Sequence, residues 1–315
     1  MVSTVTALPR GRVESESPAD ARYAKFPPRL NLVLVPLGHG AATAMAMTMY
    51  TASRPLTLSA LRAVWAAAIV TGGRATPGTR TGWTPPMERA TFDALWQQWR
   101  QTIPGPVDGL AIYQRPQSNR VGLTVMVCAG RRSLLVRIRQ DPAELALERR
   151  ISEAAARRPP RTFGVPAFSG AGQVDGWHWT AYQVMSRRPH RPGTQPPAGL
   201  TEEITTLVES VIERPAGTPA HWRGAHGDLT PWNFRRSHLG TWLIDWEDAG
   251  WLPPGADEVY FKATAAATRD GRLRPLQLPA GSGEARAMWA QIVANRVTSA
   301  NEQFRSDRLR SVLAL

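Results

Sequence analysis

The chain has 315 residues, enough to bury one large core or two medium-sized ones. Its single cysteine, Cys128, excludes a disulfide framework and a thiolate metal site within the chain, and favours a reducing, cytoplasmic compartment. The net charge of +13 comes without a run of five basic residues or interleaved aromatics, so it favours a solvated arginine-rich surface over nucleic-acid binding.

The first 30 residues are expected to form a disordered tail, because they are polar, are interrupted by prolines and lack the apolar segment of a secretory signal. Residues 31–105 are expected to form a helical extension. Helical patterns occupy residues 41–52, 56–70 and 88–101. The second of these patterns is shorter than the roughly 20 residues of a membrane span and contains an arginine. It therefore predicts a core helix, and no stable membrane association is expected.

Three short apolar segments rich in β-branched residues follow, at residues 109–114, 122–130 and 133–140. Turn-like residues separate them, so they predict an antiparallel meander. Cys128 falls within the second segment and is expected to be buried. A helix capped by Asp141 should come next. Another strand is expected after that helix, and it should end near residue 186.

The rest of the chain is mainly helical in pattern. Residues 201–214 carry apolar residues at helical spacing, and Thr201 is expected to cap this helix. A polar loop at residues 226–236, a short strand at residues 241–245 and further helical segments complete the chain. Strands with one helix, followed by helices around a polar loop, predict an α+β fold.

The polar loop carries residue types that phosphoryl transfer requires. The sequence HGDLTPWN at residues 226–233 is followed by LIDWE at residues 243–247. Asp228 can accept or orient the proton of an attacking hydroxyl, while Asn233 and Asp245 can hold Mg²⁺ against nucleotide phosphates. Strand alternation places Asp245 on the same face as the leucine two residues earlier, which would let it emerge toward the metal.

These two segments resemble the catalytic loop and metal-binding segment of the aminoglycoside phosphotransferase and choline kinase family. The resemblance implies a two-lobed protein-kinase-like fold. Residues 106–185 would form an N-lobe with an antiparallel sheet and a helix, and residues 186–315 a mainly helical C-lobe. It also implies that Asp228 is the catalytic base, that Asn233 and Asp245 are the magnesium ligands, and that the loop is supported by His226 and Asp257.

The expected nucleotide site is less regular. The family has a lysine on the third strand, paired with a helix glutamate, where this chain offers Arg137 and Glu148. Arg139 lies on the same strand face and is an alternative to Arg137. The resemblance further implies a hinge near Met185 that would contact the adenine. No glycine-rich phosphate loop is present, since residues 115–119 read RPQSN.

The expected activity is transfer of the γ-phosphoryl group of ATP (or GTP), with Mg²⁺, to a hydroxyl of a small molecule such as a sugar, amino alcohol or antibiotic. From residue 261 onward four acids face nine basic residues, which argues against a polycationic acceptor and for a neutral or anionic one. Two alternatives stay open: a degenerate kinase-fold regulator or scaffold that binds nucleotide weakly, and a basic protein that binds nucleic acid or a membrane surface. The oligomeric state is not specified by the sequence.

Overall fold

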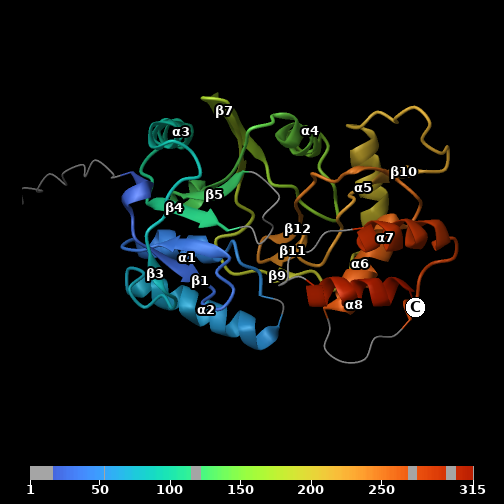
Figure 1. Ribbon diagram of the computed structural model, residues 1–315, viewed down its shortest axis with the longest axis horizontal. Helices are drawn as coiled ribbons and strands as arrows, with labels where there is room; N and C mark the ends of the chain where they lie inside the picture. The colour runs from blue at the N-terminus through green and yellow to red at the C-terminus, as the bar shows by residue number, and fades with distance from the viewer. Residues whose placement is uncertain (1–16, 53, 115–121, 269–274, 296–302, 315) are drawn as a thin grey trace, which may run out of the picture.

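The protein is described by a computed structural model, which covers residues 17–52, 54–114, 122–268, 275–295 and 303–314. Figure 1 shows a part built on a large β-sheet beside a part rich in helices. The strand pairs of the large sheet are antiparallel. The expected mixed fold with an antiparallel sheet is confirmed.

The elements lie in the following order along the chain. The strands are β1 (Tyr23–Phe26), β2 (Val33–Pro36), β3 (Arg80–Thr81), β4 (Gly109–Tyr113), β5 (Leu123–Cys128), β6 (Leu134–Arg139), β7 (Phe168–Val174), β8 (Trp177–Gln183), β9 (Arg191–Pro192), β10 (Arg223–Ala225), β11 (Phe234–Ser237), β12 (Gly240–Leu243) and β13 (Gly250–Leu252). The α-helices are α1 (Gly40–Met47), α2 (Pro55–Val70), α3 (Arg89–Thr102), α4 (Ala143–Arg157), α5 (Leu200–Glu209), α6 (Ala256–Ala267), α7 (Gly283–Asn295) and α8 (Gln303–Ala314).

The large sheet has eight strands in the order β3-β1-β2-β4-β5-β6-β8-β7. The expected meander is present as β4, β5 and β6, which are neighbours in the sheet. Helix α4 follows β6. Its N-cap is Pro142, so the cap predicted at Asp141 is wrong by one residue. The side chain of Asp141 still accepts the backbone N–H of Ala143, at 2.8 Å. The strand expected after this helix is also present, as β8.

The N-terminal region corrects the sequence-based expectation. Residues 31–105 are not a helical extension, because β2 and β3 belong to the same sheet as the meander. The tail expected over the first 30 residues is wrong for Tyr23–Phe26, which form β1; residues 1–16 lie outside the described residues. β2 pairs directly with β4, with Val33 opposite Tyr113. The sheet therefore begins well before residue 106, where an N-lobe was expected to start.

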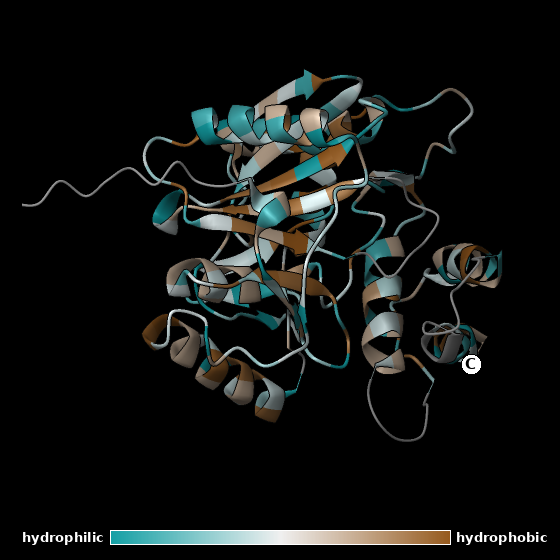
Figure 2. Ribbon diagram, turned by 60° about the vertical axis from the view of Figure 1, so that its left-hand side comes forward, coloured by the Kyte–Doolittle hydropathy of each residue, from teal (hydrophilic) through white to brown (hydrophobic). Residues whose placement is uncertain are grey.

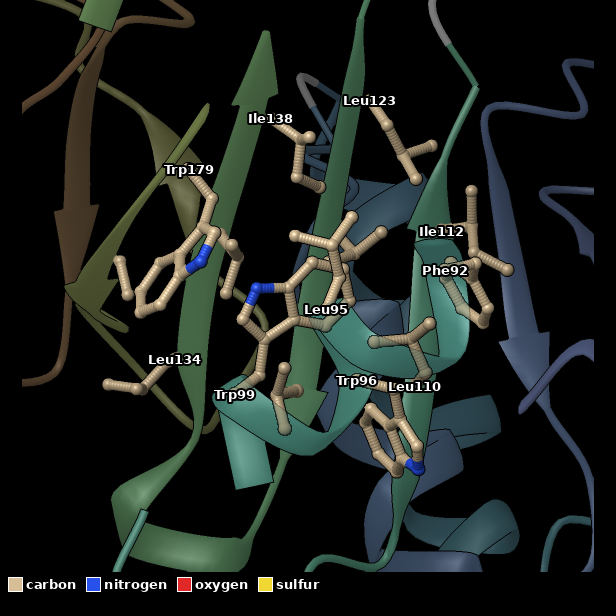
Figure 3. Close-up of a cluster of buried hydrophobic side chains, with 14 of the residues drawn as sticks. Phe92, Leu95, Trp96, Trp99, Leu110, Ile112, Leu123, Leu134, Ile138 and Trp179 are labelled. Atoms are coloured by element: carbon tan, nitrogen blue, oxygen red, sulfur yellow. The ribbon is translucent and has the colours of Figure 1, made fainter. Parts of the chain in front are cut away.

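Helix α3 covers one face of the sheet. Its buried residues Phe92, Leu95, Trp96 and Trp99 recur at helical spacing and pack against strand residues that alternate along β4, β5, β6 and β8. Figure 3 shows these aromatic rings lying over the strands. The Trp179 indole donates to the side-chain oxygen of Gln98 at 2.8 Å, which ties β8 to this helix.

Helices α1 and α2 cover part of the opposite face. Their buried alanine, methionine and leucine side chains pack against β1, β2, β4 and β5, and Cys128 is fully buried there as expected. Along β6, Val136 faces α3, so alternation turns Arg137 to the same face as α1 and α2. The part of this face next to β8 is left for a polar site.

The remaining helices build two further hydrophobic clusters. One joins α4 and α5 to the segments around β11 and β12, and the other joins α6, α7 and α8. Figure 2 shows hydrophobic residues concentrated in strands of the large sheet. Helix α5 begins at Leu200 with Gly199 as its N-cap, so the cap predicted at Thr201 is wrong. Among the described helices, none combines the length and hydrophobicity needed to cross a bilayer.

Candidate functional site

Asp257 in α6 supports the polar loop at residues 226–233 through hydrogen bonds. The two carboxylate oxygens of Asp257 accept the backbone N–H groups of His226 at 2.7 Å and Gly227 at 3.0 Å. Burial raises the pKa of Asp257 to about 6, although these two hydrogen bonds oppose that rise. The support that the resemblance implied for Asp257 is therefore present as a pair of buried hydrogen bonds.

His226 connects this loop to the chain before Asp245. Its Nδ1 accepts the backbone N–H of Asp228 at 3.2 Å, and its Nε2 lies 3.1 Å from the carbonyl oxygen of Ile244. This arrangement requires the neutral tautomer with the proton on Nε2. Burial lowers the pKa of His226 to about 4, so the imidazole stays neutral at physiological pH. The His226 side chain thus fixes the position of the loop that carries Asp228 relative to the segment that carries Asp245.

Gly227 permits a close approach between the loop and the backbone at Asp248. Its φ is +79°, and a Cβ placed there would lie 2.0 Å from the carbonyl oxygen of Asp248. Gly217 has a similar φ of +82°, but a Cβ there would meet nothing within 4 Å. Both glycines thus have a backbone conformation that disfavours other residues, but only at Gly227 would a side chain also collide with neighbouring backbone.

Gly227→Ala should lower the free energy of unfolding by clearly more than the matched control Gly217→Ala. The control should cost about 1 kcal/mol, the usual penalty of a left-handed alanine. Gly227→Ala must in addition move the backbone of Asp248, which should bring the total to at least about 3 kcal/mol. Denaturant unfolding of both variants measures the difference. Equal losses would show that the contact with Asp248 imposes no steric limit.

Asp228 and Asn233 face each other across the loop. The Asn233 side-chain nitrogen donates to Oδ2 of Asp228 at 2.7 Å and to its backbone oxygen at 3.0 Å. A turn at Thr230 closes the loop, because its carbonyl oxygen accepts the N–H of Asn233 at 3.1 Å. The amide nitrogen of Asn233 is engaged by Asp228, so its oxygen is the atom that can ligate a cation.

Asp245 lies two residues beyond β12, which ends at Leu243. Its φ is +69°, a left-handed conformation that is uncommon for residues other than glycine. Leu243 is fully buried in the core, whereas the Asp245 side chain is 29% exposed and contacts Arg137. The expected alternation with Leu243 is therefore wrong: the left-handed backbone at Asp245 directs its side chain, and the ring of the next residue, Trp246, is buried in the core.

Arg137 binds three carboxylates at once. Its guanidinium contacts Asp245 directly, lies 3.1 Å from Glu148 in α4 and lies 3.4 Å from Glu247. Only 10% of the Arg137 side chain is exposed. Burial lowers the pKa of Arg137, but the charges of Glu148 and Asp245 outweigh this effect and raise it, so the group is permanently cationic.

The two strand arginines have different surroundings. Arg139 pairs with Glu144 at 3.1 Å and donates to the carbonyl oxygens of Leu123 and Ile138, whereas Arg137 contacts Asp245 and Glu247. The alternative in which Arg139 takes the place of Arg137 is therefore wrong. The predicted pair of Arg137 with Glu148 is brought together, and the possibility of a solvent-facing Arg137 is excluded by its burial.

Two other predicted features stand apart from this cluster. Met185 is half-buried and lies two residues after β8 ends, so its contact with a nucleotide base stays a prediction. The RPQSN segment at residues 115–119 lies outside the described residues. Sequence reasoning missed Glu247 as a partner of Arg137, although its place two residues after Asp245 was the available signal.

The arrangement brings a half-buried carboxylate, an amide oxygen and a buried cation into one region. Within the described parts of the chain, no three histidine, cysteine or acidic side chains are placed to hold a metal by themselves. A site with one carboxylate and one amide suits Mg²⁺, which keeps several waters and takes phosphate oxygens as ligands. Such a set of groups can position a polyphosphate and deprotonate a hydroxyl beside it.

Comparisons with known proteins give matches among solved structures. No family model matches the sequence. A search of curated proteins also gives no match. Ninety-four chains of solved structures match, among them aminoglycoside phosphotransferases, a fructosamine kinase and a choline kinase.

Three examples show the extent of the similarity. A proposed fructosamine-3-kinase of Haemophilus somnus is 9% identical with a TM-score of 0.44, over 72% of this chain and 99% of the other. A proposed aminoglycoside phosphotransferase of Ralstonia eutropha is 14% identical with a TM-score of 0.43, over 70% and 95%. The choline kinase of Cryptosporidium parvum is 12% identical with a TM-score of 0.39, over 70% and 85%.

Proposed function

We propose that this protein transfers the γ-phosphoryl group of ATP or GTP to a hydroxyl group of a small molecule. The observation that carries the proposal is the set of contacts around His226. This side chain bonds the backbone of Asp228 on one side and the residue before Asp245 on the other. It thereby holds the loop of Asp228 and Asn233 beside the cluster of Asp245 and Arg137.

Asp228 is the proposed base. Its carboxylate accepts the amide of Asn233 through one oxygen, Oδ2, and this bond fixes the side-chain rotamer. The other oxygen can accept the proton of an acceptor hydroxyl as that hydroxyl attacks phosphorus. Because the residue is only half-buried, an acceptor can reach it from solvent.

Asn233 and Asp245 are the proposed ligands of Mg²⁺. The charges leave room for a cation: the carboxylates of Glu148, Asp245 and Glu247 carry three negative charges against the one positive charge of Arg137. The buried guanidinium of Arg235 also interacts with Asp245 and offsets part of this negative charge. Bound there, Mg²⁺ would neutralise charge on the transferring phosphates. The oxygens of Asn233 and Asp245 are of the hard type that this ion prefers.

Arg137 is the proposed phosphate contact of the sheet. Glu148 holds the guanidinium from α4 at 3.1 Å, so Arg137 stays oriented toward the loop when Asp245 exchanges it for a metal. The planar guanidinium can then make paired hydrogen bonds to phosphate oxygens. Met185, at the end of the neighbouring strand, is the proposed contact of the base. We further propose a cytoplasmic protein without a nucleic-acid partner and without stable membrane association.

The proposal requires nucleotide binding that depends on Mg²⁺. The affinity for ATP should fall by about tenfold or more when EDTA removes the metal, because the carboxylates then repel the phosphates. Calorimetric titration with ATP, with and without Mg²⁺, measures the change. Mn²⁺, which also accepts oxygen ligands, should restore binding. Equal affinity with and without a divalent cation would contradict the metal assignment.

One observation favours a second reading, a nucleotide-binding regulator without turnover. The guanidinium of Arg137 forms an ion pair with the Asp245 carboxylate and could prevent that carboxylate from binding a metal. The variant Arg137→Lys tests which of the two functions applies. Lysine keeps a positive charge at this position, but as a compact point charge it cannot bind three carboxylates in one plane as the guanidinium does. In an enzyme this variant should retain or raise ADP formation in an acceptor screen. A protein that binds MgATP but forms no ADP in either version would be the regulator.

A further inference from the structure

A cavity of about 1200 Å³ opens beside the catalytic loop. Its wall is formed by residues 194–202, by one face of α6, by residues 275–277, by Arg308 of α8 and by Leu229. Leu229 follows Asp228 directly, so the wall reaches the residue next to the proposed base. The N–H of Gly193, just before the wall segment, also bonds the carbonyl oxygen of Pro231 in the loop at 3.2 Å.

We propose that this cavity binds the phosphoryl acceptor, and that the acceptor is an uncharged, hydroxyl-rich molecule with an apolar face, such as a glycoside. This inference rests on the proposed function and names the class of its substrate. The volume exceeds the roughly 300–1,000 Å³ of common ligand pockets, so a molecule larger than a single sugar ring can enter.

The charges among the described wall residues cancel. Glu202 and Glu258 are acidic, and Lys262 and Arg308 are basic. The Lys262 ammonium is already engaged, because it lies 2.8 Å from the Glu258 carboxylate and donates to the carbonyl oxygen of Gln277 at 2.8 Å. Arg308 donates to the carbonyl oxygen of Ala267 at 3.0 Å. A polycation or a polyanion would therefore meet as much repulsion as attraction.

The uncharged part of the wall suits a hydroxylated ligand. Thr194, Gln195, Thr201 and Gln277 line the cavity, and their side chains can both donate and accept hydrogen bonds. The same cavity is also lined by apolar surface, from Pro196, Pro197, Ala265, Ala266 and Leu276. Hydroxyl partners together with apolar surface match the two sides of a sugar ring or of a glycoside with an apolar substituent.

The test uses four probes that differ in charge. Maltose and salicin are neutral, kanamycin is a polycation, and glucose 6-phosphate is an anion. Calorimetry measures binding of each probe to the full-length protein with the ATP analogue AMP-PNP and Mg²⁺, and a coupled assay measures ADP formation with ATP. We expect a neutral glycoside to bind and to raise ADP formation above the rate without acceptor, and the charged probes to do neither.

Ala265→Trp tests the location. Ala265 lines the cavity from α6, and an indole there would fill space that the acceptor needs. The affinity for the neutral glycoside should fall by about tenfold or more, through steric exclusion. Ala63→Trp is the matched control, because Ala63 is exposed on α2 and belongs to neither site. Unfolding midpoints of both variants report whether the fold is kept.

The outcomes separate the two proposals. If kanamycin or glucose 6-phosphate binds more tightly than the neutral probes, the assigned substrate class is overturned. If a neutral glycoside binds equally to wild type and Ala265→Trp, the cavity is not its site. If a neutral glycoside binds in the cavity but no ADP forms, the binding inference stands and the proposed phosphoryl transfer fails. If none of the neutral probes binds, the inference is overturned, even where MgATP binds.

Discussion

Asp228→Asn should lower the rate of ADP formation by about two orders of magnitude or more while leaving MgATP affinity nearly unchanged, as for loss of a positioned base. Asparagine has the same shape and can still accept the hydrogen bond from the Asn233 amide, which in the wild type is 2.7 Å long. The loop should therefore keep its conformation. Only the capacity to accept a proton at this position is removed.

The measurement is single-turnover ADP formation with the best acceptor from the screen, together with calorimetric affinity for MgATP. Asp93→Asn is the matched control. Asp93 is a half-buried residue of α3, outside the site, that pairs with Arg89 at 2.9 Å and accepts the Ser17 hydroxyl at 2.5 Å. Its substitution should change neither quantity, because surface ion pairs contribute little. An Asp228→Asn protein with wild-type turnover would remove Asp228 from the role of base.

Arg137→Ala should have the second-largest effect, on both stability and nucleotide affinity. The substitution leaves the carboxylates of Glu148, Asp245 and Glu247 facing one another without their shared cation. Removing one partner of a buried ion pair costs about 3–5 kcal/mol, and Glu148 is nearly as buried as Arg137, with 12% of its side chain exposed. Affinity for MgATP should fall by roughly tenfold to a hundredfold, the usual worth of hydrogen bonds to a charged group.

Arg139→Ala separates stability from nucleotide binding. Arg139 is as deeply buried as Arg137, but its hydrogen bonds go to backbone carbonyl groups and its ion pair to Glu144. This variant should lose stability and keep its affinity for MgATP. Denaturant unfolding and calorimetry at a temperature where both variants are folded give the comparison. Equal MgATP affinity in wild type and both variants would show that the sheet supplies no phosphate contact.

The sequence predicts the meander and its helix well, because the signal is local. The short segments LTVMVC of β5 and LLVRIR of β6 are rich in apolar and β-branched residues, and such side chains favour a pleated backbone. The strands β1 and β2 have only four residues each, and nothing in YAKF or VLVP specifies a pairing. β2 pairs with β1 along its full length, and it joins the rest of the sheet through a second pairing with β4, in which Leu34 lies opposite Ile112. Such a distant pairing leaves no local pattern.

The site shows the same division between local and distant information. Asp228 and Asn233 are five residues apart in one loop, so their spacing is readable from the sequence. Glu247 and Arg137 are separated by 110 positions, and only the folded chain brings their side chains within 3.4 Å. The left-handed backbone of Asp245 is also unreadable, because the residue is not a glycine and no rule of strand alternation predicts this conformation.

Helix α3 lies near the N-terminus but packs on strands that are synthesised much later, and this order affects how the chain folds during synthesis. Helix α3 ends at Thr102, but the aromatic face that it buries includes contacts to β8, which ends at Gln183. At roughly 5–20 residues per second, a ribosome needs on the order of 4–16 seconds to add those residues. During that interval the side chains of Trp96 and Trp99 in the nascent chain lack part of the hydrophobic surface that buries them in the folded protein. We expect chaperones that recognise exposed aromatic segments to bind this chain before its synthesis is complete.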